Sequence, residues 1–410
     1  MSAERCRFCQ EILTESVVDL GMSPLSNAFV PERQAAAMEP FYPLHAWVCS
    51  ACRLMQLAAF ESPSRIFSDY VYFSSYSDSW LEHCARYVAG VITRYGLGAP
   101  AQIVEIASND GYLLQYFQRA GRLVFGIEPA ANVAAAALAK GVPTEVAFFG
   151  RETAGRLRAA GHAPDLIIAN NVLAHVPELN DFVAGLKLLL APGGVATIEV
   201  PHLQRLIEDN QFDTIYHEHF SYFSLLTAER IFARHGLAVF DVEELPTHGG
   251  SLRLHIGHAE AGRAIQPAID EVRRREIAAG LDTPEPYRRF GARIVETKCA
   301  ILDFLIGAHR QGRRVLGYGA PAKGNTLLNY CGVGPELIAF TVDRNPHKQG
   351  CLLPGTRIPV RDPAALIEAR PDYVLILPWN LRAEVMAQLA EIRAWGGQFV
   401  VPIPGLQVLA

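Results

Sequence analysis

The chain has 410 residues, of which 50% are hydrophobic and 19% charged, and its formal net charge at pH 7 is −5. This length exceeds one ordinary hydrophobic core and predicts two or three domains. A near-balanced charge without a basic stretch argues against nucleic acid or anionic lipid as a partner. No apolar run is long enough to span a bilayer, and the polar start MSAERCRFCQ is unlike a signal peptide, so we expect a soluble, cytoplasmic protein with no membrane partner.

Two cysteine pairs lie near the amino terminus, Cys6-x-x-Cys9 and Cys49-x-x-Cys52. In a reducing compartment they predict a structural zinc site, because each pair places two thiolates on one side of a tight turn. Redox dithiols are the alternative, but neither pair precedes the βαβ pattern that a thioredoxin-type motif requires. The 39 residues between the pairs exceed an ordinary ribbon loop, so a folded or extended segment must lie there. The remaining cysteines lack partner spacing and are expected to be buried apolar residues: Cys84, Cys299, Cys331 and Cys351.

An aromatic stretch, DYVYFSSYSDSW, occupies residues 69–80. Its hydroxyl-bearing rings could close over a polar ligand, or they could pack as a half-buried linker. The candidates for ligand contact are Tyr70, Tyr72 and Tyr76.

From residue 102 onward, short apolar runs alternate with helical segments. The runs QIVEIA, LVFGIE, DLIIAN and VATIEV are expected to be strands. The segments NDGYLLQYFQRAG and ANVAAAALAKG, and a further segment that ends in APGG, are expected to contain helices. Continuous apolar strands that alternate with amphipathic helices predict a doubly wound parallel sheet covered on both faces.

Such sheets bind ligands at the carboxyl ends of their strands. Polar residues follow four predicted strands there: Glu105 to Asp110, Glu128, Asn170 with Asn171, and Glu199 to His202. The loop EIASNDG lacks both the G-x-G-x-x-G pattern and a cation, while Glu128 suits a bidentate contact to a ribose diol. A nucleoside without phosphate, as in S-adenosylmethionine, fits this set. A solvated loop carboxylate is the alternative for Glu128.

A charged helical segment from about Ala264 to His309 follows THGGSLRLHIGH and marks a domain boundary. Beyond it, RRVLGYGAPAKGNTLLNY, IAFTVDRNPHKQG, DYVLILPWN and GQFVVPIPG form a second alternation, which predicts a Rossmann-like α/β domain. Gly317, Gly319 and Ala322 fit G-x-G-x-x-A, and the acidic residue expected after the second strand is Asp343. This fingerprint favours a dehydrogenase.

Two further residues of that loop and helix offer a different reading. Lys323 and Asn325 place a cation and an amide where a diphosphate could lie against the helix amino terminus.

Several motifs together resemble one enzyme family: VEIASNDGYLL, GIEPA, ANNVLAHVPELNDFV, YHEHFSYFS and GYGAPAKGNT, preceded by the cysteine pairs. They resemble the S-adenosylmethionine-dependent C-methyltransferases of nucleotide-linked deoxysugars, especially the C-3 methyltransferases of TDP-linked 4-keto sugars. The resemblance covers nearly the whole chain. Ala107 and Ser108 stand where broader class I methyltransferases favour glycine, which is the form expected within the sugar family.

We therefore expect an α/β protein with a zinc-binding domain over residues 1–66, a class I methyltransferase domain over 67–263 and a nucleotide-sugar-binding, Rossmann-like domain over 264–410. The expected zinc ligands are the four paired cysteines. The expected cofactor contacts are Glu105, Ala107, Ser108, Asn109, Gly111, Glu128, Pro129, Asn170 and Asn171.

The segment FDTIYHEHFSYF, residues 212–223, suggests the chemistry. Carbon beside a ketone becomes a nucleophile when a base removes its proton and the enolate is stabilised. A neutral imidazole suits this task, so His219 is the first candidate, which the resemblance supports. Tyr216 and Glu218 match the same motif, near the keto oxygen, the base or the sugar, and His175 joins them by resemblance. His217 would face the opposite side if the segment is extended. A metal site built on the two histidines of H-x-H and a packed aromatic loop are the alternatives.

Together these expectations predict that the protein methylates C-3 of a nucleotide-linked 4-keto deoxysugar, in deoxysugar or antibiotic biosynthesis. The nucleotide diphosphate would lie near Lys323, Asn325 and Arg344, and the resemblance implies that at least one tyrosine of residues 69–80 reaches the sugar. A nicotinamide-dependent oxidoreductase and a non-catalytic nucleotide sensor or scaffold are the alternative functions. We expect a nucleotide-sugar as partner and a monomer, although the sequence leaves the oligomeric state open.

Overall fold

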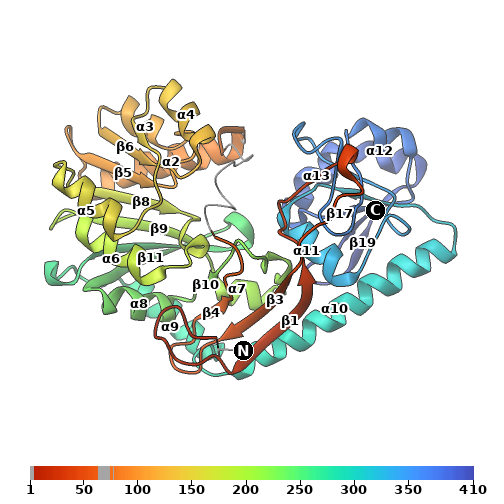
Figure 1. Ribbon diagram of the computed structural model, residues 1–410, viewed down its shortest axis with the longest axis horizontal. Helices are drawn as coiled ribbons and strands as arrows, with labels where there is room; N and C mark the ends of the chain where they lie inside the picture. Colours follow the sequence, from red (N-terminus) through yellow and green to blue (C-terminus); the bar gives the residue numbers. More distant parts are fainter. Residues whose placement is uncertain (1–3, 63–73, 77) are drawn as a thin grey trace.

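The computed structural model describes residues 4–62, 74–76 and 78–410 of the chain. Figure 1 shows two α/β domains on opposite sides of the molecule, with the amino-terminal strands β1 (Glu15–Ser23) and β3 (Tyr42–Val48) rising between them. The long helix α10 (Glu285–Arg310) runs along their base. The predicted α/β class, with a central parallel-rich sheet and a small amino-terminal module that carries the paired cysteines, is confirmed.

The amino-terminal module centres on a four-stranded antiparallel sheet with the order β1-β3-β4-β10. Its third strand is β4 (Met55–Leu57), and its last strand, β10 (Ser221–Tyr222), comes from the histidine-rich segment of the central domain. The module is thus joined by backbone hydrogen bonds to a segment that is distant in sequence.

The central domain contains a seven-stranded sheet with the order β11-β12-β9-β8-β5-β6-β7. The strands from β9 to β7 are parallel, whereas β12 and β11 are added antiparallel at one edge. All five residues of β8 are buried, as its continuous apolar run predicts for a strand covered on both faces. The elements are α2 (Asp78–Tyr95), β5 (Gln102–Ile106), α3 (Leu114–Arg119), β6 (Leu123–Ile127), α4 (Ala131–Ala139), β7 (Thr144–Glu145), α5 (Arg151–Ala159), β8 (Leu166–Asn170), α6 (Leu179–Leu189), β9 (Val195–Pro201), α7 (Leu203–Glu208), α8 (Leu225–Arg234), β11 (Leu237–Leu245) and β12 (Ser251–His258).

The carboxyl-terminal domain contains a six-stranded sheet with the order β16-β14-β13-β17-β18-β19, which is parallel except for β19. Within the described part of the chain, no helix is both long and apolar enough to cross a membrane. The elements are α9 (Pro267–Ala278), α10, β13 (Val315–Tyr318), α11 (Ala322–Cys331), β14 (Thr341–Val342), β15 (Cys351–Leu352), β16 (Val360–Arg361), α12 (Ala364–Ala369), β17 (Tyr373–Ile376), α13 (Arg382–Gln388), β18 (Gln398–Val401) and β19 (Gln407–Leu409).

Between β1 and β3 the chain leaves the amino-terminal module and packs on the carboxyl-terminal domain. Figure 1 shows this part as the red stretch that follows β1. Its strand β2 (Val30–Pro31) pairs with β15 in a two-stranded antiparallel sheet. Farther along, Glu39 forms an ion pair with Arg357 at 2.8 Å and accepts the Gly355 N–H at 3.2 Å. This excursion accounts for the long gap between the cysteine pairs.

The four unpaired cysteines do not share one environment. Cys84 and Cys331 are buried, as predicted, whereas the prediction for Cys299 and Cys351 is wrong, because the first is exposed and the second half-exposed. Cys299 lies on α10 outside the stripe of buried residues that faces the protein, which includes Ile294 and Ile301.

Candidate active site

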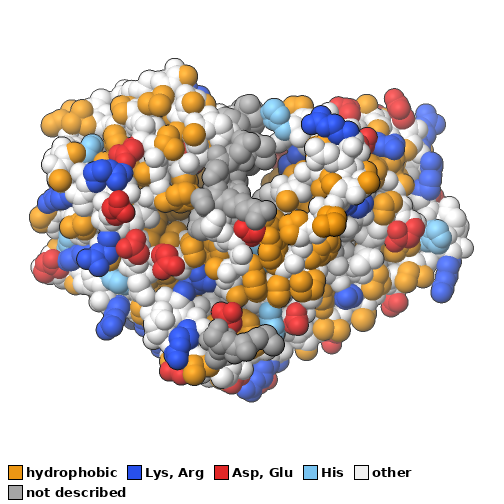
Figure 2. Space-filling view, viewed as in Figure 1, with side chains coloured by type: hydrophobic (Ala, Val, Ile, Leu, Met, Phe, Trp, Pro, Cys, Tyr) orange, Lys and Arg blue, Asp and Glu red, His pale blue; other side chains and the backbone are white. Residues whose placement is uncertain are grey.

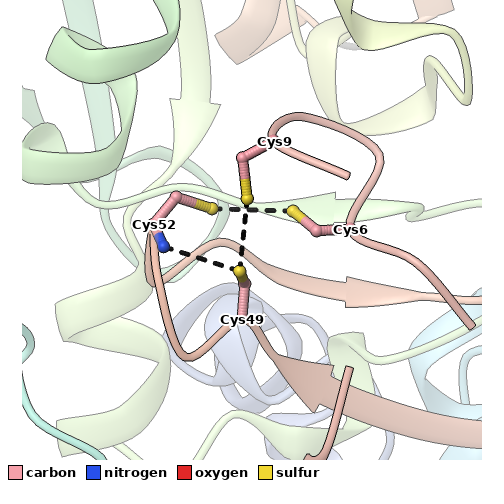
Figure 3. Close-up of side chains that lie close together, drawn as sticks. All are labelled: Cys6, Cys9, Cys49 and Cys52. Atoms are coloured by element: carbon pink, nitrogen blue, oxygen red, sulfur yellow. Dashed lines mark hydrogen bonds between the residues drawn. The ribbon is translucent and has the colours of Figure 1, made fainter. Parts of the chain in front are cut away.

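The four paired cysteines converge on one point, and Figure 3 shows their sulfurs facing one another. Their Sγ atoms all lie within 4.8 Å of one another, with Cys6 and Cys52 at 3.5 Å and Cys9 and Cys49 at 3.5 Å. Four thiolates around zinc, with Zn–S bonds of about 2.3 Å, would place their sulfurs about 3.8 Å apart. Gln56 Nε2 donates to Cys6 Sγ at 3.2 Å, which favours the thiolate. The residues therefore fit a structural zinc ion.

The loop after β5 makes a tight turn at the carboxyl edge of the central sheet. Ala107, Asn109 and Gly111 adopt φ angles of 55°, 50° and 75°. Only glycine adopts such an angle without strain, and a Cβ at Gly111 would also lie 3.0 Å from Val142 Cγ2. The loop is therefore held in a shape that brings its backbone toward the end of β6.

The acidic residue that follows β6 receives this loop. Glu128 accepts the Asn109 N–H at 2.9 Å with one carboxylate oxygen and the Ala130 N–H at 2.9 Å with the other. Burial raises its pKa above the ordinary value, and the two N–H groups oppose that shift. Each oxygen keeps an acceptor position for a hydroxyl group. Pro129, half-exposed, lies between Glu128 and Ala130 in the chain.

Several buried polar atoms at the same sheet edge have no hydrogen-bond partner among the described residues: Ser108 Oγ, Asp110 Oδ1, Asn170 Oδ1 and Asn171 Oδ1. Glu105, within β5, is fully buried, and burial raises its pKa well above the ordinary value. Buried polar groups are normally paired, and each unpaired group costs about 1–3 kcal/mol. A polar ligand at this edge would satisfy them. The predicted cofactor residues are therefore assembled in one place and fit S-adenosylmethionine.

The histidine-rich segment forms a turn rather than an extended strand, so the condition under which strand alternation would separate His217 from His219 is not met. The His219 N–H donates to the Tyr216 carbonyl at 2.8 Å, and the chain reverses there. His217 still faces away from His219, because its Nε2 lies 3.2 Å from the Pro43 carbonyl oxygen. The nitrogens of the two histidines point to different partners, which gives no support to a metal site between them.

The hydrogen bonds of His219 define its tautomer. Its Nδ1 lies 2.9 Å from the Thr214 carbonyl oxygen, which can only accept, so Nδ1 carries the proton. Its Nε2 is then an acceptor and lies 2.9 Å from the Tyr216 hydroxyl. Burial lowers the pKa of His219 well below its ordinary value, and His175, whose ring centroid is 4.8 Å away, lowers it further. The imidazole is therefore neutral near pH 7, with its lone pair on Nε2.

Two neighbouring elements hold this segment in place. The β10 strand pairs with β4, with Tyr222 opposite Met55. The Phe220 N–H donates to the Ala174 carbonyl at 2.7 Å, and this contact fixes the short 3-10 helix Leu173–His175 beside the turn. His175 and His219 are therefore brought together by the zinc-binding module as much as by the central sheet.

Glu218 is almost fully buried, with 3% of its surface exposed. Asn27 Nδ2 donates to both of its carboxylate oxygens, at 2.8 Å and 3.0 Å. Burial raises the pKa of Glu218 to about 7, and the bond from Asn27 opposes that shift. Its protonation is thus balanced near neutral pH.

The carboxyl-terminal domain faces the same segment. Trp379 Nε1 donates to Asp213 Oδ2 at 2.7 Å, and burial raises the pKa of Asp213 to about 6. Lys323 Nζ lies 4.4 Å from the Trp379 ring centroid and donates to Asn380 at 2.9 Å. Its positive charge contributes to lowering the pKa of His219. Lys323 thus lies close enough to act on the histidine cluster electrostatically.

The other predicted substrate residues lie in different surroundings. Asn325 is buried and donates to the Ser26 carbonyl at 2.6 Å, whereas Arg344 is exposed and its Nη1 lies 3.9 Å from Glu384. Tyr70 and Tyr72 lie outside the described residues. The backbone of Tyr76 ends the short 3-10 helix Ser74–Tyr76.

His248 is a further residue of this region that the sequence reading missed. It has a φ of 58°, unusual for a residue other than glycine, and its ring centroid lies 5.6 Å from that of Trp80. The surrounding protein and the charge of Lys323 together lower its pKa to about 4. The double glycine after His248 in THGGS marks the strained turn and was the available signal.

These groups come from both α/β domains and act on one another electrostatically where the domains approach. Figure 2 shows the molecule hollowed between its two halves. His175, His219, His248 and Lys323 each keep partial exposure to solvent although the surrounding protein lowers the pKa of each.

The glycines of the carboxyl-terminal fingerprint are explained by packing within the protein. A Cβ at Gly317 would lie 2.6 Å from Thr341 Oγ1, and one at Gly319 would lie 2.6 Å from Pro378 Cδ. Asp343 accepts the Ala320 N–H at 2.7 Å with one carboxylate oxygen. The fingerprint therefore requires no dinucleotide.

Comparisons with known proteins agree along the chain. Residues 6–67 match a family described as a proposed zinc-binding domain, residues 80–242 a methyltransferase domain and residues 246–404 the C-methyltransferase C-terminal domain. The chain is 37% identical over 407 residues to C-methyltransferase NovU of Streptomyces niveus, covering 99% of this chain and 97% of the relative.

Solved structures resemble about half of the chain. Magnesium protoporphyrin IX methyltransferase from Synechocystis PCC 6803 with bound S-adenosylmethionine is 16% identical, with a TM-score of 0.34 over 47% of this chain and 88% of that one. The PH0226 protein of Pyrococcus horikoshii OT3 is 13% identical, with a TM-score of 0.36 over 48% of this chain and 99% of that one.

Proposed function

Because the chain belongs to the S-adenosylmethionine-dependent C-methyltransferases, we propose that it methylates C-3 of a 4-keto deoxysugar carried on a nucleoside diphosphate, with thymidine as the nucleoside. The observation that carries the proposal is the neutral His219, whose Nε2 is an acceptor paired with the Tyr216 hydroxyl and lies between the cofactor edge and the carboxyl-terminal domain. We assign zinc binding to residues 1–66, the cofactor to 67–263 and the nucleotide-sugar to 264–410.

The reaction requires C-3 to become nucleophilic before it meets an electrophile. His219 Nε2 takes the C-3 proton, and the electrons of that C–H bond pass into the enolate formed with the C-4 carbonyl. The Nδ1–H bond to Thr214 holds the ring and stabilises the imidazolium that forms. For this step the Tyr216 hydroxyl has to turn away from Nε2, whose single lone pair receives the proton, and from there it can donate to the enolate oxygen.

The cofactor supplies an electrophilic methyl group when bound. The chain's own contribution there is Glu128, whose free acceptor positions suit the ribose hydroxyls, and the unpaired polar atoms of Ser108, Asn170 and Asn171. The position of this edge next to the histidine cluster supports transfer to carbon where the two domains approach.

The nucleotide, which lies far from the reacting carbon of the substrate, serves to orient the sugar. Holding both reactants in one geometry removes the entropic cost of their encounter, which is worth about 7–11 kcal/mol in a well-aligned site. Lys323 is the candidate cation for the diphosphate, Arg344 is a second from the exposed surface, and Asn325 acts through its bond to Ser26.

The oxidoreductase alternative is not favoured. The residues that carry its fingerprint lie in the region that matches the C-methyltransferase C-terminal domain, and the glycine contacts with Thr341 and Pro378 account for the motif.

Proton exchange tests the proposal directly. The protein is incubated in D2O with S-adenosylhomocysteine and a TDP-linked 4-keto deoxysugar, and the C-3 proton is followed by NMR. We expect exchange with the natural chain and none with His219→Asn, which should still bind S-adenosylhomocysteine in calorimetry. Undiminished exchange in His219→Asn would remove His219 from the mechanism, and no exchange with the natural chain would contradict the proposed substrate.

A further inference from the structure

The loop Pro24–Phe29, which follows β1, is built as a compact turn. The Ala28 N–H donates to the Leu25 carbonyl at 3.1 Å, and the Phe29 N–H donates to the Asn27 carbonyl at 2.9 Å. These bonds fix the direction of the Asn27 side chain between them. The loop belongs to the segment between the cysteine pairs, for which the zinc site alone gives no reason.

The loop is anchored to the carboxyl-terminal domain. The Ser26 carbonyl accepts from Asn325 Nδ2 at 2.6 Å, and Ser26 Oγ lies 3.4 Å from Thr326 Oγ1. Both partners are on α11, the helix that follows the glycine loop of that domain. The pairing of β2 with β15 continues the attachment immediately after the loop.

The same loop reaches the histidine-rich segment through one side chain. Asn27 Nδ2 bridges the two carboxylate oxygens of Glu218, and Glu218 directly precedes His219. Among the described residues, Asn27 is the side chain that donates hydrogen bonds to this carboxylate. Bridging both oxygens from one side leaves their remaining acceptor positions directed elsewhere, where a sugar hydroxyl can use them.

We propose that Asn27 is a positioning residue for methyl transfer: it fixes the carboxylate of Glu218, the residue that directly precedes the base in the chain, and the contact between Ser26 and Asn325 ties that arrangement to the carboxyl-terminal domain. The amino-terminal segment is then an active-site element and not only a zinc-binding module. This inference rests on the proposed function, because it gives Glu218 the task of holding the sugar.

The chemistry of the carboxylate explains why its partner is required. A buried carboxylate without a donor is strongly disfavoured, and burial already raises the pKa of Glu218 to about 7. Removing Asn27 leaves that carboxyl group protonated or displaced. The sugar then loses an oriented acceptor, while the cofactor edge keeps all its contacts.

The experiment compares Asn27→Ala and Asn27→Asp with a matched control, Ala28→Ser, which changes an exposed residue of the same turn. The aspartate variant keeps the size of the side chain but replaces the amide donor with a second acidic group facing Glu218, so it tests the role even if the alanine variant folds poorly. The readouts are kcat and KM for methyl transfer from labelled S-adenosylmethionine to the TDP-linked 4-keto deoxysugar, affinity for S-adenosylhomocysteine, and zinc content.

We expect kcat to fall about 10- to 100-fold in both Asn27 variants, as for the loss of a hydrogen bond to a charged group. Affinity for S-adenosylhomocysteine and zinc content should stay unchanged, and Ala28→Ser should match the natural chain. An unchanged kcat in Asn27→Asp, or an equal loss in Ala28→Ser, would overturn the role of Asn27. Absence of methyl transfer by the natural chain would instead refute the proposed function.

Discussion

Replacing Glu218 with glutamine should stabilise the ligand-free protein, and the gain should grow with pH. The carboxyl group titrates at a pKa of about 7 in the folded protein against an ordinary value of 4.5. Between these values the folded chain holds a proton that the unfolded chain has released, so the stability of the natural protein falls as pH rises. Glutamine has no charge to bury and can still accept from Asn27.

The size of the effect follows from the two pKa values. By removing the cost of burying the charge, Glu218→Gln should raise the free energy of unfolding by about 1 kcal/mol at pH 5 and about 3 kcal/mol at pH 8. Urea unfolding of the natural chain and Glu218→Gln at both pH values measures it, since the difference between the two proteins cancels titrations they share, such as those of His175 and His248. A difference that stays constant with pH, or that favours the natural chain more at pH 8, would refute the reasoning.

Three further predictions concern the other parts of the site. Cys49→Ser should lower the metal content from about one zinc per chain and reduce the melting temperature; full stability without metal would contradict a structural zinc site. Trp379→Phe removes the side-chain donor of the buried Asp213 carboxylate, so unfolding should be easier by about 1–3 kcal/mol and kcat should fall, with affinity for S-adenosylhomocysteine preserved in calorimetry. Glu128→Ala should weaken S-adenosylhomocysteine binding at least about tenfold while thymidine diphosphate binding stays the same; equal loss of both would show general unfolding.

The sheets and the zinc site could be predicted because their signals are local in the sequence. A short apolar run such as LIIA within DLIIAN, between helical segments, is typical of a strand covered on both faces, and the spacing of paired cysteines is typical of a zinc site. The excursion of residues between the cysteine pairs onto the carboxyl-terminal domain has no such local signal.

The contacts between domains were missed for the same reason. Asn27 meets Glu218 across 191 residues of sequence, and Asp213 meets Trp379 across 166. No periodicity links such pairs, and PLSNAF contains no pattern specific to a site. The alternation of side chains along a strand does not apply to His217, because the hydrogen bond between the His219 N–H and the Tyr216 carbonyl makes a turn there.

The central claim is methyl transfer to a sugar carbon, and the most direct measurement is the position of the transferred methyl group. The protein is supplied with S-adenosylmethionine carrying a ¹³C-methyl group and a TDP-linked 4-keto deoxysugar, and the product is examined by carbon NMR. The account predicts that the labelled methyl carbon is bonded to C-3. C-3, which also carries its own substituent, should then have no proton left. A label on oxygen or nitrogen, or no transfer at all, would contradict it.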